Sequence, residues 1–324
     1  MTRFTVVLAL ALLLLVPASE VRAQSGAGAQ SLLITPGARA DAMGRAYAAV
    51  ANDATATWWN PAALAFIEQR NLSFMHTQLV PGLANDVYYE FLGYAQNVPG
   101  WGGIGANFIY LTYGTSQGTD EQGNPTVSFT SYEFALTGSA GTEIFHNMSA
   151  GLSVKFVYVN LAPKEATLDQ QKGSGSTFAL DPGTYYKVPA IPLTFAAVFQ
   201  NLGPDIAYID EAQADPLGRN LKLGVAYQVF HSQNMHLLGS FDFNQPLVYT
   251  NPMETPIYNG GVEFGYAGLL ALRAGYIYDH EGTIEDPTFG IGLAYKGFSF
   301  DYASVPQSKH LDQRVSKFSL NAKF

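Results

Sequence analysis

The side chains best suited to bind a metal are six histidines and one acidic segment. The histidines are His76, His146, His231, His236, His280 and His310. The acidic segment contains Asp279, His280, Glu281, Glu285 and Asp286. His231 and His236 flank a turn, but no cysteine or carboxylate stands near them at the spacing of a zinc site. The acidic segment lacks the regular ligand spacing of a calcium loop, so a solvated loop is the better interpretation and we predict no metal site.

Two glycine-rich stretches raise the question of nucleotide binding or nucleophilic catalysis. Residues 100–105 resemble a phosphate loop, but they open an expected strand, whereas such loops precede a helix. Residues 173–176 (GSGS) lie in an expected loop, outside the strand–turn–helix context of a nucleophile elbow. The chain has no cysteine, which excludes disulfides, thiolate metal sites and a lipoprotein anchor. We therefore predict a protein that is not an enzyme and carries no cofactor.

Several charged residues interrupt otherwise apolar, alternating segments. They are Glu133, Lys155, Glu263, Arg273, Lys296, Asp301 and Lys317. If the apolar faces of these segments meet lipid, the charged side chains face the lumen of a barrel. A three-residue turn at 267–269 would place Glu263 opposite Arg273, which predicts an ion pair. Such charges either pair to stabilise a filled lumen, since an unpaired buried charge is costly, or line a path for a substrate.

The elements that position these charges are strands, because apolar and polar residues alternate from Arg70 to the end of the chain. We count about 14 candidate strands; the clearest runs from Met148 to Asn160. Short turns are predicted at 97–100, 143–147, 188–191, 230–234, 267–269 and 296–297. Longer polar links are predicted at 114–126, 161–176, 202–216, 245–254, 279–287 and 304–311. Alternating short and long connections, with Phe324 ending the last strand, are typical of an outer-membrane β-barrel whose acidic loops lie outside the cell.

The composition agrees with a transmembrane barrel. Only 13% of the residues are charged, about half the usual share of a soluble domain, while aromatic residues also make up 13%. The mean hydropathy of +0.05 is too low for a helical membrane protein. The formal net charge of −9 argues against a nucleic-acid partner, which would require clustered Lys and Arg.

The N-terminus has the pattern of a secretory signal peptide. Arg3 is followed by an apolar run from Phe4 to Val16, and Val-Arg-Ala at 21–23 fits a cleavage site. About 13 apolar residues are too few to span a bilayer as a helix, which takes about 20. We expect residues 1–23 to be removed by cleavage and the mature protein to be exported.

Residues 37–66 differ from everything after them, being rich in Ala and Gly and almost uncharged. We expect short helices, over 38–50 and from Asn60 onward, where Asn-Pro is a favourable start. This segment would form a plug inside the barrel. Adjacent Trp58 and Trp59 cannot share a helix face; they either seat the plug by packing, or one of them meets a ligand or the backbone.

The plug and several later segments carry a resemblance to a known family. Residues 37–39 (GAR), 41–44 (DAMG) and 60–64 (NPAAL) are similar to the N-terminal hatch of FadL-like outer-membrane proteins, and more narrowly to the PorV/PorQ family associated with type IX secretion. Further matching segments are 199–204, 260–264, 272–276 and 295–303, so the resemblance covers the mature chain. It implies a 14-stranded barrel (68–324) holding a leader and hatch (24–67). The implied hatch residues for ligand contact or gating are Arg39, Asp41, Met43, Trp58, Trp59, Asn60 and Pro61.

The resemblance implies two alternative functions in the outer membrane of a Gram-negative bacterium. PorV-like proteins receive secreted cargo from a translocon and pass it to a surface-attachment complex, which makes cargo proteins or secretion-system subunits the expected partners. The broader FadL-like group takes up hydrophobic small molecules such as fatty acids, through the hatch and a lateral opening in the wall. The first function predicts a lumen sealed by paired charges, and the second predicts an apolar cavity behind the two tryptophans.

Overall fold

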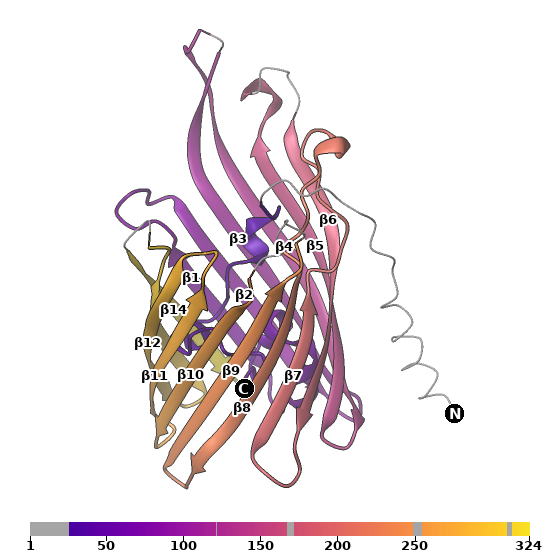
Figure 1. Ribbon diagram of the computed structural model, residues 1–324, viewed down its shortest axis with the longest axis vertical. Helices are drawn as coiled ribbons and strands as arrows, with labels where there is room; N and C mark the ends of the chain where they lie inside the picture. Colours follow the sequence, from indigo (N-terminus) through magenta and orange to yellow (C-terminus); the bar gives the residue numbers. More distant parts are fainter. Residues whose placement is uncertain (1–25, 121, 167–171, 249–254, 310–312) are drawn as a thin grey trace, which may run out of the picture.

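The computed structural model describes residues 26–120, 122–166, 172–248, 255–309 and 313–324 (Figure 1). The expected signal peptide, residues 1–23, lies outside these ranges. The structure is one closed antiparallel barrel in which each strand pairs with its sequence neighbours and β1 pairs with β14. The strands are β1 (Asn71–Gln78), β2 (Val87–Val98), β3 (Gly102–Thr119), β4 (Pro125–Phe145), β5 (Met148–Ala162), β6 (Gly173–Lys187), β7 (Leu193–Gln200), β8 (Asn220–His231), β9 (Met235–Pro246), β10 (Ile257–Tyr266), β11 (Leu270–Asp279), β12 (Ile284–Tyr295), β13 (Phe298–Pro306) and β14 (Arg314–Lys323). No helix among the described residues is long and apolar enough to span a membrane.

The alternating sequence decides which side chains point into the barrel. In β14, Lys317 and Ser319 are buried, while Phe318 and Leu320, which alternate with them, are exposed on the outer wall. Such an apolar outer surface suits contact with lipid, and the closed sheet leaves no open strand edge to the membrane. Exposed aromatic residues stand at or near the short-turn end of the wall: Trp101, Phe145, Tyr186, Phe230, Tyr266, Tyr295, Phe298 and Phe324. They correspond to the aromatic girdle that membrane barrels carry at an interface.

The connections differ between the two ends of the barrel. Short turns at one end include 146–147, 267–269 and 296–297, whereas the opposite end carries the longest connection, 201–219. Following the arrangement of outer-membrane barrels, we refer to the second end as external. Residues 114–119 and 125–126 are strand, although the sequence predicted a loop there. This stretch is polar, and its pairing with β4 forms a largely exposed β-hairpin.

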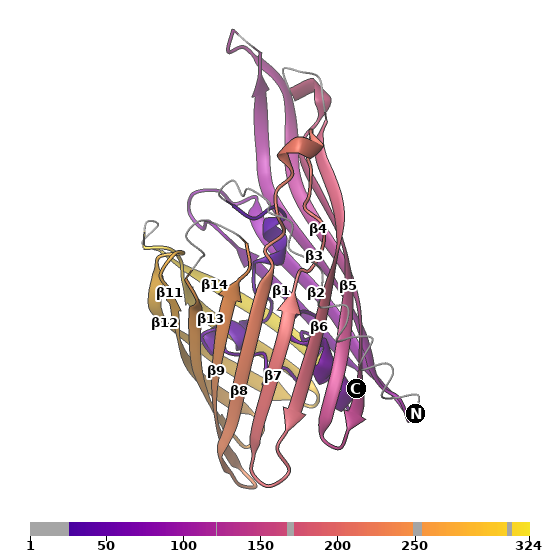
Figure 2. The same ribbon diagram turned by 45° about the vertical axis from the view of Figure 1, so that its right-hand side comes forward.

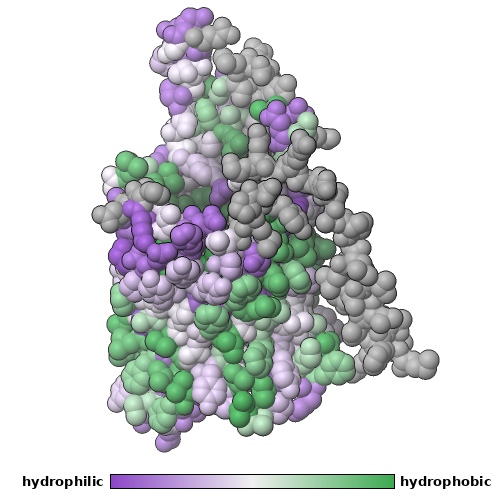
Figure 3. Space-filling model, viewed as in Figure 1, coloured by the Kyte–Doolittle hydropathy of each residue, from purple (hydrophilic) through white to green (hydrophobic). Residues whose placement is uncertain are grey.

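The wall is much taller on one side than on the other. Strands β3 to β6 rise well above the remaining strands, which gives the external end a slanted rim (Figures 1 and 2). Hydrophobic side chains gather over the lower part of the wall, and hydrophilic ones gather at the level of the upper loops (Figure 3). The projecting part of β3–β6 therefore lies above the apolar band that faces the membrane.

Inside the barrel lie the leader, residues 26–36, and the hatch, residues 37–67 (Figure 2). Their elements are η1 (Gln30–Leu32), α2 (Ala38–Ala42), α3 (Ala56–Trp59) and η2 (Pro61–Phe66). The predicted helix over 38–50 ends at Ala42 because Gly44 and Arg45 both have left-handed backbone angles, with φ of 64° and 67°. This turn directs the chain across the lumen, which a continued helix could not do.

Glycines of the strands form the surface on which the hatch lies. A side-chain carbon at these positions would overlap hatch atoms: Gly103, Gly141, Gly151, Gly183, Gly224, Gly261, Gly275 and Gly290. Gly103, Gly141 and Gly151 face η2, whereas Gly261 and Gly275 face the turn after α2. Small inward residues therefore allow the hatch backbone to contact the wall directly around much of its circumference.

Candidate functional site

The carboxylate of Glu263 on β10 is one of the groups that attach the hatch to the wall. Its Oε2 accepts hydrogen bonds from Arg39 Nε at 2.7 Å and from Arg273 Nε at 2.6 Å, and its Oε1 accepts from Arg39 Nη2 at 2.8 Å. Arg273 also binds Asp301 through Nη1 at 2.6 Å. His236 Nε2 lies 3.3 Å from Glu263 Oε1. This group balances two guanidinium charges with two carboxylates, so the lumen contains no unpaired charge at this point.

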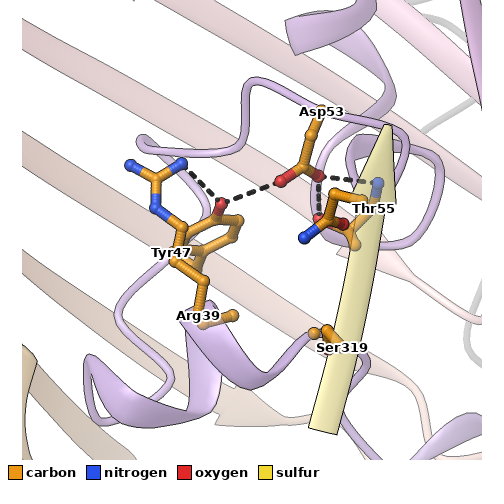
Figure 4. Close-up of a pocket in the computed structure, with 8 residues that line it drawn as sticks. Arg39, Tyr47, Asp53, Thr55 and Ser319 are labelled. Atoms are coloured by element: carbon orange, nitrogen blue, oxygen red, sulfur yellow. Dashed lines mark hydrogen bonds between the residues drawn. The ribbon is translucent and has the colours of Figure 1, made fainter. Parts of the chain in front are cut away.

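Arg39 extends the same network into the hatch. Its Nη1 donates to Asn52 Oδ1 at 2.8 Å and to the Tyr47 hydroxyl, which lies 3.3 Å from Asp53 (Figure 4). Asp53 accepts hydrogen bonds from the backbone N–H and hydroxyl of Thr55, at the start of α3. Burial raises the pKa of Tyr47 well above its ordinary value, so its ring stays a neutral phenol.

Beside these residues is a cavity of about 10 Å³, lined on the wall side by Ser319 and Asn321 and on the hatch side by Arg39 and Tyr47 (Figure 4). That volume is close to the minimum of roughly 10–15 Å³ that one water molecule needs. The cavity is therefore too small to hold an organic ligand in this conformation.

A second buried ion pair joins the hatch to β14. Lys317 Nζ lies 2.7 Å from Asp41 Oδ2 and donates to the Thr35 carbonyl at 3.0 Å. Asp41 Oδ1 accepts from the Thr35 hydroxyl at 2.7 Å and from Arg45 Nε at 3.2 Å. All the charges of this group have partners, which makes burial of the two side chains tolerable.

The two tryptophans form the aromatic centre of the hatch. Trp59 is fully buried, and its Nε1 donates to the Pro36 carbonyl at 3.0 Å. Trp58 crosses it edge-on with ring centroids 4.7 Å apart, and Tyr47 does the same from another side at 5.5 Å. Lys222 Nζ on β8 lies 5.1 Å from the centre of the Trp59 ring, a cation–π contact with the wall. Both tryptophan rings are packed against protein groups.

Asn60 and Pro61 position η2, whereas Met43 lies directly before the left-handed turn at Gly44 and Arg45. The Asn60 side chain accepts from Ala62 N at 3.1 Å, capping η2, and donates to the Thr184 carbonyl of β6 at 3.0 Å. Pro61 occupies the first position of η2, where its missing N–H is not needed. Met43 is fully buried, and its carbonyl lies against Gly261.

The remaining predicted charges lie apart from the Glu263 group. Lys155 Nζ lies 2.6 Å from Asp181 Oδ2 on β6 and 2.7 Å from Asn201 Oδ1, and the whole group is buried. Glu133 accepts from Ser31 N of the leader at 2.8 Å and from the hydroxyl of Tyr113. The inward charges therefore form separate clusters that tie leader, hatch and wall together.

The prediction that Lys296 faces the lumen is wrong. Lys296 stands in the turn between β12 and β13 with φ of 47°, and it is exposed. Its Nζ lies over the ring of the neighbouring Tyr295, at 5.2 Å from the ring centre. The alternation of inward and outward side chains ends with β12 at Tyr295. Extending it to Lys296 therefore predicted the wrong direction for this side chain.

Sequence reasoning missed the inward pair of polar residues on β9. The fully buried Asp242 accepts from Tyr47 N at 2.9 Å and Ala48 N at 3.0 Å, which holds the middle of the hatch. Asn244 accepts from the ammonium of Lys222 on β8. The signal was present, because Asp242 and Asn244 alternate with Phe241 and Phe243 along the strand.

A closed 14-stranded barrel filled by an N-terminal hatch is the architecture of FadL-like outer-membrane proteins. Within that class, the chain matches the family described as "Type IX secretion system protein PorV" over residues 18–253, and it belongs to that family. No curated protein matches it.

Similar solved structures are also barrels of this class. The toluene transporter TodX of Pseudomonas putida superposes with a TM-score of 0.55 at 14% identity, covering 89% of this chain and 98% of TodX. The toluene transporter TbuX of Ralstonia pickettii gives a TM-score of 0.52 at 15% identity, covering 89% of this chain and 96% of TbuX. At such identities the likeness establishes the fold alone.

Proposed function

We propose that this protein is a component of type IX secretion that binds secreted protein cargo, or the translocon subunits that deliver it, at the external rim of its barrel. Membership of the PorV family supports this function. The structural observation that carries it is the filled lumen. The core joins hatch, leader and wall, with Tyr47 and Trp59 from the hatch, Leu32 from the leader, and Ile109 and Leu111 from β3 all buried.

The external surface is what such a barrel offers to a protein partner. The side formed by β3–β6 projects above the apolar band, and the loop 201–219 lies against its inner edge (Figure 2). Two residues of this loop bond to β6. Leu202 pairs with Leu180, and the Tyr208 carbonyl accepts a hydrogen bond from Ser174 N. This one-sided wall supplies a surface away from lipid, where a cargo domain could bind without entering the lumen.

The test compares secretion with uptake in a strain that lacks the gene. We expect proteins with a C-terminal sorting domain to accumulate inside the cell or to lose their surface attachment, while uptake of toluene and fatty acids stays unchanged. A second variant replaces residues 115–128 with a short turn, which removes the projecting β3–β4 hairpin and leaves the barrel. It should reproduce the secretion defect at normal barrel abundance. Normal secretion together with lost uptake would exclude the proposal.

Transport of hydrophobic small molecules is the second candidate, and one feature of the wall favours it. β6 and β7 pair only over Gly183–Lys187 and Thr194–Val198, although β6 continues toward the external end. Above this short ladder, β6 is joined to the segment that follows β7, through the bridge between Leu180 and Leu202. A wall that opened here would connect the lumen with the lipid.

A disulfide in place of the Leu180–Leu202 bridge, which we call the seam, distinguishes the two functions. The chain has no cysteine, so Leu180→Cys with Leu202→Cys introduces a single pair at bridge-partner positions, where the usual Cα separation suits a disulfide. If the seam is a transport route, oxidation should lower toluene uptake and reduction should restore it. If the protein serves secretion, the oxidised and reduced forms should secrete cargo equally well.

A further inference from the structure

A groove of about 300 Å³ opens on the outer wall where β1 meets β14, near the external end. Its lining residues are His76, Thr77, Gln78, Pro81, Arg314, Ser316 and Phe318. The volume is at the lower end of the roughly 300–1,000 Å³ found for small-molecule sites. The groove belongs neither to the hatch nor to the lumen, because His76, Arg314, Ser316 and Phe318 occupy outward positions of their strands.

The position of the groove along the strands is given by a row of aromatic side chains. His76, Tyr88, Tyr110, Tyr132 and Tyr158 follow one another across β1–β5, with successive ring centroids 5.5, 6.2, 6.1 and 6.3 Å apart. Outward tyrosines in such a row mark the level of the lipid headgroups. Phe318 pairs with His76 in the β1–β14 ladder, and Arg314 lies four residues further toward the external end. The groove therefore runs from the acyl-chain boundary into the headgroup layer.

The two ends of the groove differ in chemistry. Phe318 contacts Phe300 and Tyr302 at centroid distances of 6.1 and 5.4 Å, which makes the lower end apolar. At the upper end, Arg314 donates through Nε to the Ser304 hydroxyl at 2.8 Å and through Nη2 to the Pro287 and Ser304 carbonyls at 2.9 and 2.8 Å. These bonds fix the direction of the guanidinium.

Arg314 forms no ion pair with the residues that the structure describes. Within the described ranges, no Asp or Glu oxygen lies within 4 Å of its guanidinium nitrogens. Because Nε and Nη2 are engaged in the bonds to Ser304 and Pro287, Nη1 is the guanidinium nitrogen that can donate a charge-assisted hydrogen bond to a phosphate oxygen at headgroup level.

We propose that this groove binds the phosphorylated, acylated glycolipid that forms the outer leaflet of the outer membrane. An acyl chain lies along Phe318, a headgroup phosphate binds Arg314, and the Ser316 hydroxyl and Gln78 amide face the sugar. The site is continuous with the lipid-facing wall and lies at its external end, where that glycolipid is the surrounding lipid. It is independent of cargo binding, because it lies outside the barrel and below the projecting hairpin.

The test measures lipid binding to the purified full-length mature barrel in detergent by native mass spectrometry. The probes are bisphosphorylated lipid A, the same lipid after removal of its phosphates, and phosphatidylglycerol. We expect lipid A to bind at least roughly tenfold more tightly than its dephosphorylated form, as a charge-assisted contact would give. It should also bind more tightly than phosphatidylglycerol, which has a phosphate but no sugar to face Ser316 and Gln78. Equal binding of dephosphorylated lipid A, or tighter binding of phosphatidylglycerol, would overturn the proposal.

Two variants and one control locate the site. Arg314→Ala should remove the preference for phosphorylated lipid A, while Arg314→Lys should retain part of it. Because Arg314 also bonds β12 and β13, a separate variant, Ser316→Trp, fills the groove without removing the cation and should weaken lipid A binding as well. The control is Lys172→Ala, which removes an exposed cation that bonds Tyr158 of the aromatic row. A loss of preference in the control that equals the loss in Arg314→Ala would refute the assignment.

Discussion

Glu263 on the barrel wall and Arg39 on the hatch meet side-on, with Nε–Oε2 and Nη2–Oε1 distances of 2.7 and 2.8 Å. The same carboxylate binds Arg273 of the neighbouring strand. The wall therefore holds Glu263 in place whether or not the hatch is present. Burial alone would lower the pKa of Arg39, but the attraction of Glu263 raises it well above its ordinary value, so the contact persists over the whole physiological pH range.

Arg39→Gln tests whether this contact holds the hatch. The change removes two charge-assisted hydrogen bonds, worth about 1.5–3 kcal/mol each at most, while Glu263 keeps Arg273 as its partner. We expect the barrel to remain folded and the hatch to become mobile, which is measured as increased ion conductance of single barrels in planar bilayers. Arg45→Gln is the control, because Arg45 bonds Asp41 within the hatch itself. Equal conductance in both variants would contradict this role of Arg39.

Gly261→Val tests the glycine surface beneath the hatch. A side chain on Gly261 would overlap the Met43 carbonyl, so we expect a loss of about 1–3 kcal/mol in the free energy of unfolding, the usual range for overpacking. The neighbouring Gly260 is the matched control, since nothing lies within 4 Å of a side-chain carbon added there. Denaturant titration of both variants in lipid vesicles measures the difference. A Gly260→Val variant as unstable as Gly261→Val would show that β10 simply does not tolerate valine.

The barrel could be predicted from the sequence because its strands and short turns are determined by residues that are close together in the chain. Alternation gives the strands, and a three-residue turn fixes the register that brings Glu263 opposite Arg273. The predicted ends of the strands were less accurate. Thr115–Thr119 continue β3 as an exposed hairpin, although their polar residues resemble those of a loop.

The hatch contacts could not be predicted in the same way. Asp41 meets Lys317 from the far end of the chain, and Asp242 meets Tyr47 N, through a path set by the left-handed turn at Gly44 and Arg45. A Gly-Arg pair in the sequence is not enough to predict such a turn, because glycine is also tolerated in a short helix. Positions of this kind depend on the shape of the whole lumen.

Asp41→Asn tests the second buried ion pair. It leaves Lys317 charged and buried without its carboxylate, so we expect the free energy of unfolding to fall by about 3–5 kcal/mol. Adding Lys317→Met should recover much of this loss, because the uncompensated charge is gone. Lys296→Met, in the exposed turn, should change stability by less than about 0.5 kcal/mol. A double variant less stable than Asp41→Asn alone would show that Lys317 contributes through its bonds to Thr35 instead.

The adjacent tryptophans allow a matched comparison within the hatch. Trp59→Phe removes the hydrogen bond from Nε1 to the Pro36 carbonyl and leaves that buried acceptor without this donor, which should cost about 1–3 kcal/mol. Trp58→Phe deletes a buried Nε1 for which the described residues provide no acceptor, so its cost should be limited to lost packing. Denaturant titration followed by circular dichroism measures both. If Trp58→Phe is the more damaging change, Trp58 contributes more to the seating of the hatch than the hydrogen bond of Trp59 does, and the aromatic stack rather than the Pro36 contact anchors α3.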